Sequence, residues 1–219
     1  MKKEICSYLP NYAYIPLILV LIINFITYNF SKLITNSFVH YNISSFIDDF
    51  LPFFPVFIIF YLLAYFQWII GFILIARESR EFCFRFLSAE IIAKLCCLLL
   101  FFVFPTTMIR PEITGTGIFD FLTKIVYFFD QPVNLFPSIH CLESYLLFRC
   151  SFFMKRVPWW YKYVTFVFSF MVCLSTVFVK QHVFWDILAG IVVVEIGIYL
   201  SDKFATGRIF DIIHKKIKP

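Results

Sequence analysis

Charged residues are scarce in this 219-residue chain. Lys, Arg, Asp and Glu together make up 15% of the sequence, whereas hydrophobic residues make up 61%. A soluble domain carries about 25% charged residues, and its core would not bury the 32 phenylalanines found here. The composition therefore excludes a soluble globular domain and indicates a polytopic membrane protein.

Other common features are also missing. The seven cysteines show none of the spacings of a metal site, so we expect small apolar fillers, no metal and no other cofactor. The chain has no recognisable internal repeat or low-complexity linker, which predicts one membrane domain over residues 1–219. No small-residue cleavage site follows the first apolar run, so we expect no cleavable signal peptide. The sequence leaves the oligomeric state open.

Six apolar stretches are long enough to cross a bilayer, for which a helix needs about 20 residues. We therefore predict an all-α bundle of six transmembrane helices. The fourth stretch is interrupted by Glu143 and Arg149, and only Lys180-Gln181-His182 divides the fifth from the sixth, which predicts a tight helical hairpin. The predicted spans are Tyr14–Phe30, Leu51–Ala76, Phe86–Phe104, Ser138–Phe153, Tyr163–Val179 and Val183–Leu200.

Basic residues predict the orientation of the bundle, because inner loops of membrane proteins are enriched in Lys and Arg. With the N-terminus inside, the inner segments hold thirteen basic residues and the outer segments hold four. We therefore predict that both termini are cytoplasmic, and the net charge of +5 then needs no nucleic acid to explain it. The inner set is Lys2, Lys3, Arg77, Arg80, Arg85, Lys155, Arg156, Lys162, Lys203, Arg208, Lys215, Lys216 and Lys218; the outer set is Lys32, Arg110, Lys124 and Lys180.

Two of the four histidines fall on the same predicted outer edge. His140 follows Pro137-Ser138-Ile139 at the start of the fourth span, and His182 directly precedes the sixth. A helix N-terminus offers free N–H groups and a positive dipole end, which favour a phosphate. Proline suits the first turn of a helix, and the Ser138 hydroxyl can face an anion. This edge is therefore a candidate phosphate site.

His182 and Asp186 are four residues apart, which places them on one face of a helix. A carboxylate there can fix the tautomer of the imidazole and leave the second ring nitrogen free to attack. A carboxylate one turn inside a membrane is costly and is usually functional or paired. In so apolar a chain, this pattern points to phosphoryl chemistry on a lipid. The alternative is that Asp186 only caps the helix or pairs with Lys180.

Together these motifs resemble those of the type 2 phosphatidic acid phosphatase superfamily. Arg110-Pro111 resembles the end of its Lys-x6-Arg-Pro motif. Asn134-Leu135-Phe136-Pro137-Ser138-Ile139-His140 resembles its Pro-Ser-Gly-His motif. Ser175-Thr176, followed after five residues by His182 and after three more by Asp186, resembles its Ser-Arg-x5-His-x3-Asp motif. The order and spacing of the motifs and the six predicted helices agree with this superfamily.

Three positions depart from the family pattern. Val103 stands at the position of the family's Lys, Ile139 at the position of its Gly, and Thr176 at the position of its second Arg. Two of the three cationic groups that the family uses to bind phosphate are therefore missing, and Lys180 can supply one replacement charge. The bulky Ile139 and the Phe-Pro-Ser opening are similar to the sphingolipid phosphotransferase branch typified by inositol phosphorylceramide synthase.

The resemblance implies a two-step displacement. His182 attacks the phosphorus of a lipid phosphate and forms a phosphohistidine, and Asp186 orients it. His140 protonates the departing alkoxide and then activates the acceptor. For Asn134 the sequence leaves open whether it binds substrate or shapes the loop. The residues expected to bind the phosphate are Arg110, Asn134, Ser138, Ile139, Ser175, Thr176 and Lys180.

The sequence therefore predicts a multi-pass enzyme of the cell membrane with an extracytoplasmic active site. Its expected partners are the lipid bilayer and a lipid phosphate, phosphatidate-like or a polyprenyl diphosphate. The alternatives within the family are a phosphotransferase that moves a phospho-headgroup to a lipid or alcohol acceptor, and a catalytically weakened member. The alternatives of other classes are a transporter or flippase and a protein that binds haem through the two histidines.

Several charges fall within the predicted spans. Glu90 and Lys94 are four residues apart on the third span, which predicts an ion pair, and Glu195 is a second candidate partner for Lys94. Glu143 lies three residues after His140. The sequence leaves open whether Glu143 tunes the pKa of His140 or pairs with Arg149.

Overall fold

The computed structural model describes residues 9–217. Lys2, Lys3 and Lys218, which enter the predicted orientation, lie outside the described residues. The long helices are α1 (Tyr14–Phe25), α4 (Ile58–Glu78), α5 (Arg80–Val103), α6 (Ile118–Phe129), α7 (Ile139–Ser151), α8 (Tyr161–Phe178), α9 (Phe184–Phe204) and α10 (Arg208–Ile217). Shorter elements are α2 (Ser31–Thr35), α3 (Phe46–Phe50), the π-helix η2 (Ile26–Phe30), the 3-10 helices η1 (Asn11–Ala13) and η3 (Pro55–Phe57), and the strands β1 (Tyr41–Asn42) and β2 (Thr106–Thr107).

Five helical segments are long and apolar enough to cross a membrane, so the chain has the character of an integral membrane protein. They confirm five of the predicted spans with bounds shifted by a few residues: Asn11–Thr35, Pro55–Glu78, Arg80–Val103, Tyr161–Phe178 and Phe184–Phe204. The fourth predicted span corresponds to α7, which has only 13 residues. At 1.5 Å per residue, α7 is about 20 Å long and shorter than the hydrocarbon core of a bilayer.

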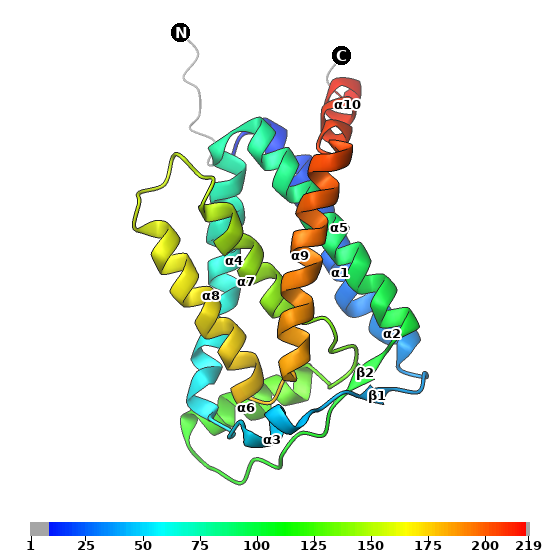
Figure 1. Ribbon diagram of the computed structural model, residues 1–219, viewed down its shortest axis with the longest axis vertical. Coiled ribbons are helices and arrows are strands. Elements are labelled where there is room, and N and C mark those ends of the chain that lie inside the picture. Colours follow the sequence, from blue (N-terminus) through cyan, green and yellow to red (C-terminus); the bar gives the residue numbers. More distant parts are fainter. Residues whose placement is uncertain (1–8, 218–219) are drawn as a thin grey trace.

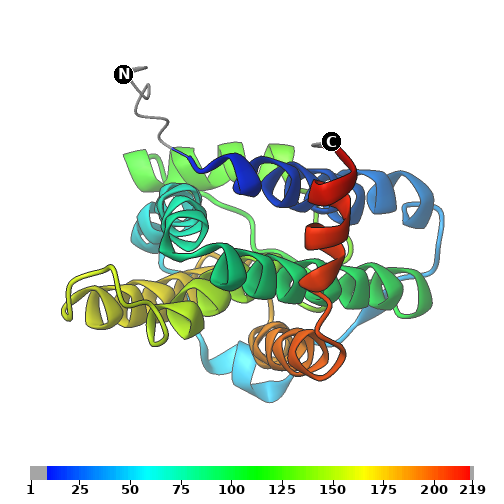
Figure 2. The same ribbon diagram turned by 90° about the horizontal axis from the view of Figure 1, so that it is seen from above.

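Buried packing explains why α7 is less apolar than its neighbours. α5 lies between α1 and α9 (Figure 2), and α7 packs against α4, α8 and α9. Most of the α7 side chains are buried, including Glu143 and Ser144. A helix enclosed by other helices can carry polar groups because those groups find protein partners instead of lipid. The low hydropathy of α7 therefore reflects its central position.

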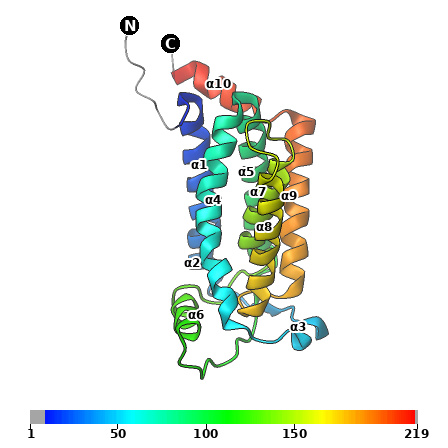
Figure 3. The same cartoon turned by 90° about the vertical axis from the view of Figure 1, so that its left-hand side faces the viewer.

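The connecting segments gather at the two ends of the bundle. The start of α1, the turn between α4 and α5, the loop between α7 and α8, and α10 lie at one end (Figure 1). α3, α6, the β1–β2 pair and the turn between α8 and α9 lie at the other end, which we call the histidine end. Figure 3 shows α6 beside the bundle at the histidine end and α10 across the opposite end. β1 and β2 pair in parallel, with Tyr41 opposite Thr106, and so join the loops before α3 and after α5.

The buried ion pairs differ in part from those expected. The ammonium of Lys94 lies 4.0 Å from Glu90, as the spacing predicts, but its closest carboxylate is Glu143 at 2.7 Å. Glu195 was wrong as a partner of Lys94, because it pairs with Arg149 at 2.9 Å. The reason is the order of helices around α5, since α7 presents Glu143 toward α5 whereas Glu195 faces Arg149. Glu143 is therefore a structural partner that joins α7 to α5.

Replacing Lys94 by Met is expected to destabilise the fold by about 3–5 kcal/mol, because it leaves buried carboxylates without their cation. Lys94 and Glu90 are fully buried, so water cannot compensate the lost charge. The midpoint of thermal unfolding in detergent measures the effect. The matched control is Arg85→Met, which breaks the half-exposed Arg85–Asp202 pair and should cost about 0–1 kcal/mol. Equal losses in the two variants would contradict the prediction.

Candidate active site

The backbone brings the starts of α7 and α9 together at the histidine end. The N–H of Ser138 donates to the carbonyl of Asp186 at 3.1 Å. Gly190, one turn further along α9, faces the carbonyl of Ser138, and a Cβ at this position would lie 2.9 Å from that oxygen. Close approach of the two helices therefore requires glycine at position 190. This contact places the two histidine motifs side by side.

His182 is held by contacts on both of its sides. Its Nδ1 lies 3.0 Å from Oδ2 of the fully buried Asp186, which also accepts the N–H of Val183 at 3.1 Å. The backbone N–H of His182 donates to the carbonyl of Thr176 at 3.0 Å. Burial lowers the pKa of His182, but the hydrogen bond and charge of Asp186 outweigh it, and the pKa lies above its usual value. This arrangement fixes Nδ1 and leaves Nε2 free to react.

His140 lies in an aromatic wall opposite His182. Its ring stacks on Tyr61 with centroids 4.0 Å apart, and Trp68 and Tyr65 lie at 5.0 and 5.5 Å. The rings of His140 and His182 are 6.5 Å apart, and the residues are 5% and 8% exposed. His140 Nε2 is buried without a hydrogen-bond partner among residues 9–217. A buried unpaired nitrogen is costly unless a ligand satisfies it.

Arg110 reaches the same end from the loop before α6. Its guanidinium donates to the carbonyl of Asp130 at 2.7 Å and to the side chain of Gln181, the residue before His182. It also lies over the ring of Tyr127, 4.5 Å from the centroid. Burial lowers the pKa of Arg110, yet a guanidinium stays charged in proteins. The structure therefore brings this predicted cation beside the histidines.

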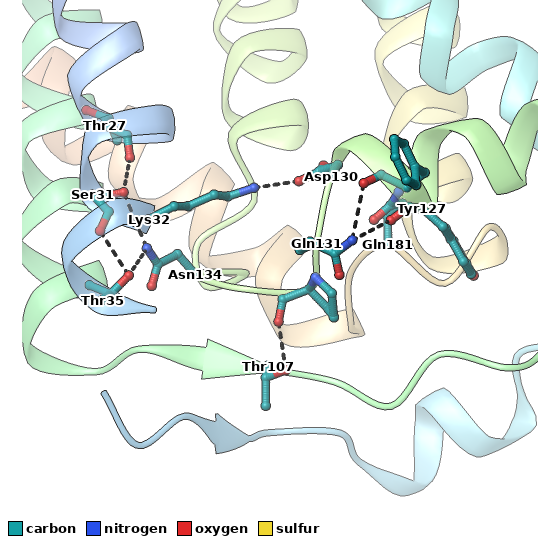
Figure 4. Close-up of polar contacts among 12 residues, drawn as sticks. Thr27, Ser31, Lys32, Thr35, Thr107, Tyr127, Asp130, Gln131, Asn134 and Gln181 are labelled. Atoms are coloured by element: carbon teal, nitrogen blue, oxygen red, sulfur yellow. Dashed lines mark hydrogen bonds and ion pairs between the residues drawn. The ribbon is translucent and has the colours of Figure 1, made fainter. Parts of the chain in front are cut away.

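Two other predicted phosphate ligands point elsewhere. The ammonium of Lys180 donates to the carbonyls of Asp48 and Leu51, at 2.8 and 2.6 Å. Lys180 has a positive φ of 53°, which turns its side chain toward α3. Asn134 donates to the hydroxyl of Thr35 at 2.7 Å (Figure 4) and so has a loop-shaping contact. In this structure the ammonium of Lys180 is therefore engaged by backbone carbonyls near α3.

The N-terminus of α9 is also engaged within the protein. The N–H of Phe184 donates to Asp48 at 2.7 Å, and the N–H of Val183 donates to Asp186. These carboxylates occupy the position that the sequence analysis gave to a phosphate, because α3 folds back under α9. At α7, the Ser138 hydroxyl oxygen accepts the N–H of Cys141 at 3.3 Å, so Ser138 caps the helix while its O–H can still donate. The N-terminus of α7 is therefore better placed than that of α9 to bind a phosphate.

The remaining predicted residues support the site through their backbone or by packing. Ser175 and Thr176 donate their hydroxyls within α8, to the carbonyls of Val172 and Cys173. The carbonyl of Thr176 accepts from both Gln181 and His182, so α8 positions the turn that carries His182. Ile139 packs into the hydrophobic core.

Sequence reasoning missed a second set of residues around the histidines. Asp130 forms an ion pair with Lys32 at 2.6 Å and accepts from Tyr61 at 3.2 Å. Burial raises the pKa of Asp130, but the charge and hydrogen bond of Lys32 and a hydrogen bond from Tyr28 outweigh it, and the pKa is lowered. Only tertiary packing places Lys32 and Asp130 together, so no local sequence signal could have identified them.

A separate hollow lies at the opposite end of the bundle. It has a volume of about 680 Å³, and its lining includes Arg80, Arg85 and Asp211. Arg80 pairs with Asp211 and Arg85 with Asp202, so four of the charged residues that line it are engaged with one another. Across residues 9–217, no group of three His, Cys, Asp or Glu residues is placed to hold a metal ion. The histidine end is therefore the candidate site.

Comparison with known families supports the resemblance seen in the motifs. Residues 105–204 match the sequence model of the PAP2 superfamily, and this match supports membership of the chain in the type 2 phosphatidic acid phosphatase superfamily. The matched region contains all three motif segments, from Arg110-Pro111 to Asp186. The match suggests phosphatase or phosphotransferase activity on phosphate esters in a membrane protein. No curated protein matches the chain in sequence.

Proposed function

We propose that the chain is a membrane lipid phosphatase that forms a phosphohistidine on His182. The observation that carries this proposal is the His182–Asp186 contact of 3.0 Å, with the His140 ring 6.5 Å from that of His182. A phosphoryl group between the two rings would meet a nucleophile on one side and a proton donor on the other. The site lies at one end of an apolar bundle, where a lipid tail can remain in the bilayer. With the predicted orientation, this end is extracytoplasmic.

The same residues act in both steps of the reaction, and His140 reverses its role from proton donor to proton acceptor. Nε2 of His182 attacks phosphorus, the bond between phosphorus and the lipid oxygen breaks, and His140 gives its proton to the departing alkoxide. Water then attacks the phosphohistidine, His140 takes the proton of that water, and the bond to His182 breaks to release phosphate. Asp186 stabilises the positive charge of the phosphorylated imidazole, and Arg110 holds phosphoryl oxygens.

The test is phosphate release from a panel of lipid phosphates by the purified protein in detergent. Phosphatidate, phosphatidylglycerol phosphate and a polyprenyl diphosphate cover the chemical classes that fit the site. Release of phosphate from at least one of them is expected, and the preferred lipid identifies the substrate class. If no lipid phosphate is hydrolysed and no phosphohistidine is trapped, the proposed phosphatase activity is wrong.

A phosphotransferase is the second candidate, and the burial of the two histidines favours it. Enclosure of His140 and His182 limits the access of water to a phosphohistidine, and water exclusion protects such an intermediate from hydrolysis. Diacylated phospholipid donors supplied together with alcohol acceptors test this activity. Formation of a new phosphodiester without release of phosphate would identify transfer as the main reaction.

The pH profile of Asp186→Asn tests how His182 is activated. Only neutral His182 attacks, so the rate falls as the pH drops through the pKa of His182, which Asp186 raises. Without this carboxylate, burial lowers that pKa, so the acid limb of kcat/KM should move to lower pH while the plateau falls. The control, Asp202→Asn at the opposite end, should keep the wild-type profile. An acid limb that stays in place or moves to higher pH would contradict the assignment.

A further inference from the structure

The site lacks the cations that its motifs would ordinarily provide. Val103, at the position of the family's Lys, is an exposed apolar residue at the end of α5. Thr176, at the position of an Arg, donates its hydroxyl within its own helix. A phosphate monoester carries up to two negative charges, and Arg110 compensates only part of them. Another cation near the histidines is therefore needed.

Lys32 approaches the site from the first membrane segment. It lies in α2, directly after the π-helix η2 (Ile26–Phe30), and π-helical turns inside α-helices are frequent at functional sites. The wider turn changes which side chains face the bundle, so Ser31 and Thr35 are buried. Lys32 extends across to Asp130, with its ammonium 2.6 Å from the carboxylate (Figure 4). The same ammonium lies 4.0 Å from the centroid of the Tyr28 ring.

Asp130 connects this ammonium to the reacting groups. The hydroxyl of Tyr61 donates to Asp130 at 3.2 Å, and the ring of Tyr61 stacks on His140. The charge of Asp130 also contributes to the raised pKa of His182. Lys32 is therefore separated from His140 by one carboxylate and one tyrosine ring.

The other cations described at this end have partners that hold them away. Lys180 donates to the carbonyls of Asp48 and Leu51, and Lys124 donates to the carbonyl of Gly115. The Lys32–Asp130 pair differs because the partner of Lys32 is a carboxylate and not a backbone carbonyl, and the two side chains are 21% and 19% exposed. A phosphate offers an ammonium the same kind of charge-assisted contact as a carboxylate does. The ammonium can therefore exchange one anionic partner for another.

We propose that Lys32 is the phosphate-binding cation that replaces the missing motif lysine. In the phosphate-free protein Asp130 holds the ammonium; when a phosphate enters, the ammonium moves to the phosphoryl oxygens and Asp130 keeps its hydrogen bond from Tyr61. The inference rests on the proposed function for its substrate, a lipid phosphate. It assigns to the first membrane segment a role outside the matched residues 105–204.

Direct titration of the purified protein with inorganic phosphate tests the inference without requiring turnover. Lys32→Met should weaken phosphate binding by about 10–100-fold, the effect of one charge-assisted contact. The matched control is Lys124→Met, which removes a lysine at the same end and should bind phosphate as the wild type does. Equal affinity of wild type and Lys32→Met, or no phosphate binding by the wild type, would overturn the inference.

A double variant separates a phosphate ligand from a structural ion pair. Asp130→Asn frees Lys32 and removes a competing anion, so phosphate should bind as well as or more tightly than in the wild type. In Lys32→Met with Asp130→Asn, binding should stay weak, because the ammonium is gone. A structural pair predicts the reverse, with weak binding in each single variant and recovery in the double variant. Failure of the proposed function is distinct, since it would show as intact phosphate binding without hydrolysis of any lipid phosphate.

Discussion

Replacing His182 by Ala should lower phosphate release by roughly 10⁴–10⁶-fold, the range seen when a covalent nucleophile is removed from a catalytic unit. The loss follows because no other group takes the place of Nε2, whose partner nitrogen is fixed by Asp186. Rapid acid-free quenching with labelled lipid phosphate should trap a phosphohistidine in the wild type and none in the variant. Substrate binding should change far less than the rate.

The control for this variant is His214→Ala, since His214 lies in α10 at the opposite end of the bundle. It should keep both the rate and the phosphoenzyme of the wild type. A phosphoenzyme trapped in His182→Ala would assign the nucleophile to another residue. The same result would leave the His182–Asp186 contact with a structural role only.

Replacing His140 by Ala should lower the rate by about 10²–10⁴-fold, the usual contribution of a general acid and base. The effect is expected to be smaller with an aryl phosphate, because a phenolate leaves without needing a proton. Comparing kcat/KM for a lipid phosphate and an aryl phosphate measures this difference. An equal loss with both substrates would argue against proton transfer by His140.

A second variant separates chemistry from packing at this position. The His140 ring stacks on Tyr61, so Ala also removes an aromatic contact. His140→Phe keeps an aromatic ring but carries no proton, so it should retain the thermal stability of the wild type and still lose activity. If His140→Phe is as active as the wild type, the ring serves only to pack.

Local patterns in the sequence were sufficient to predict much of the fold and the residues at the core of the candidate site. Long apolar runs predicted six spanning helices because burial in lipid requires such runs, and five of them are confirmed, whereas α7 is too short. His182 and Asp186 are in contact, but not on one helix face as their spacing predicted: α9 begins at Phe184, so His182 lies in the turn before the helix and Asp186 lies in its first turn. The turn at Lys180 was also predicted from the sequence, because the apolar run on its two sides is too long to form a single span.

Contacts between segments that are distant in the sequence could not be predicted from local patterns. Lys180 is close to His182 in sequence, but α3 supplies the carbonyls that draw its ammonium away. Lys32 is distant in sequence, but the first membrane segment extends past Phe30 and brings its ammonium to Asp130. For Lys94, the choice between Glu143 and Glu195 depended on which helix packs against α5. Each of these outcomes is set by the arrangement of helices, which no local spacing encodes.

The hydrogen bond between Ser138 and Asp186 also bears on the order of assembly in the cell. His140 enters the membrane region with α7, whereas His182 and Asp186 follow only with the hairpin of α8 and α9. Until that hairpin is inserted, the start of α7 has no partner for the N–H of Ser138 and no nucleophile opposite His140. Under the proposed mechanism, a nascent chain would therefore be inert toward lipid phosphates during most of its insertion, and the two histidines would come together in one of the last docking events.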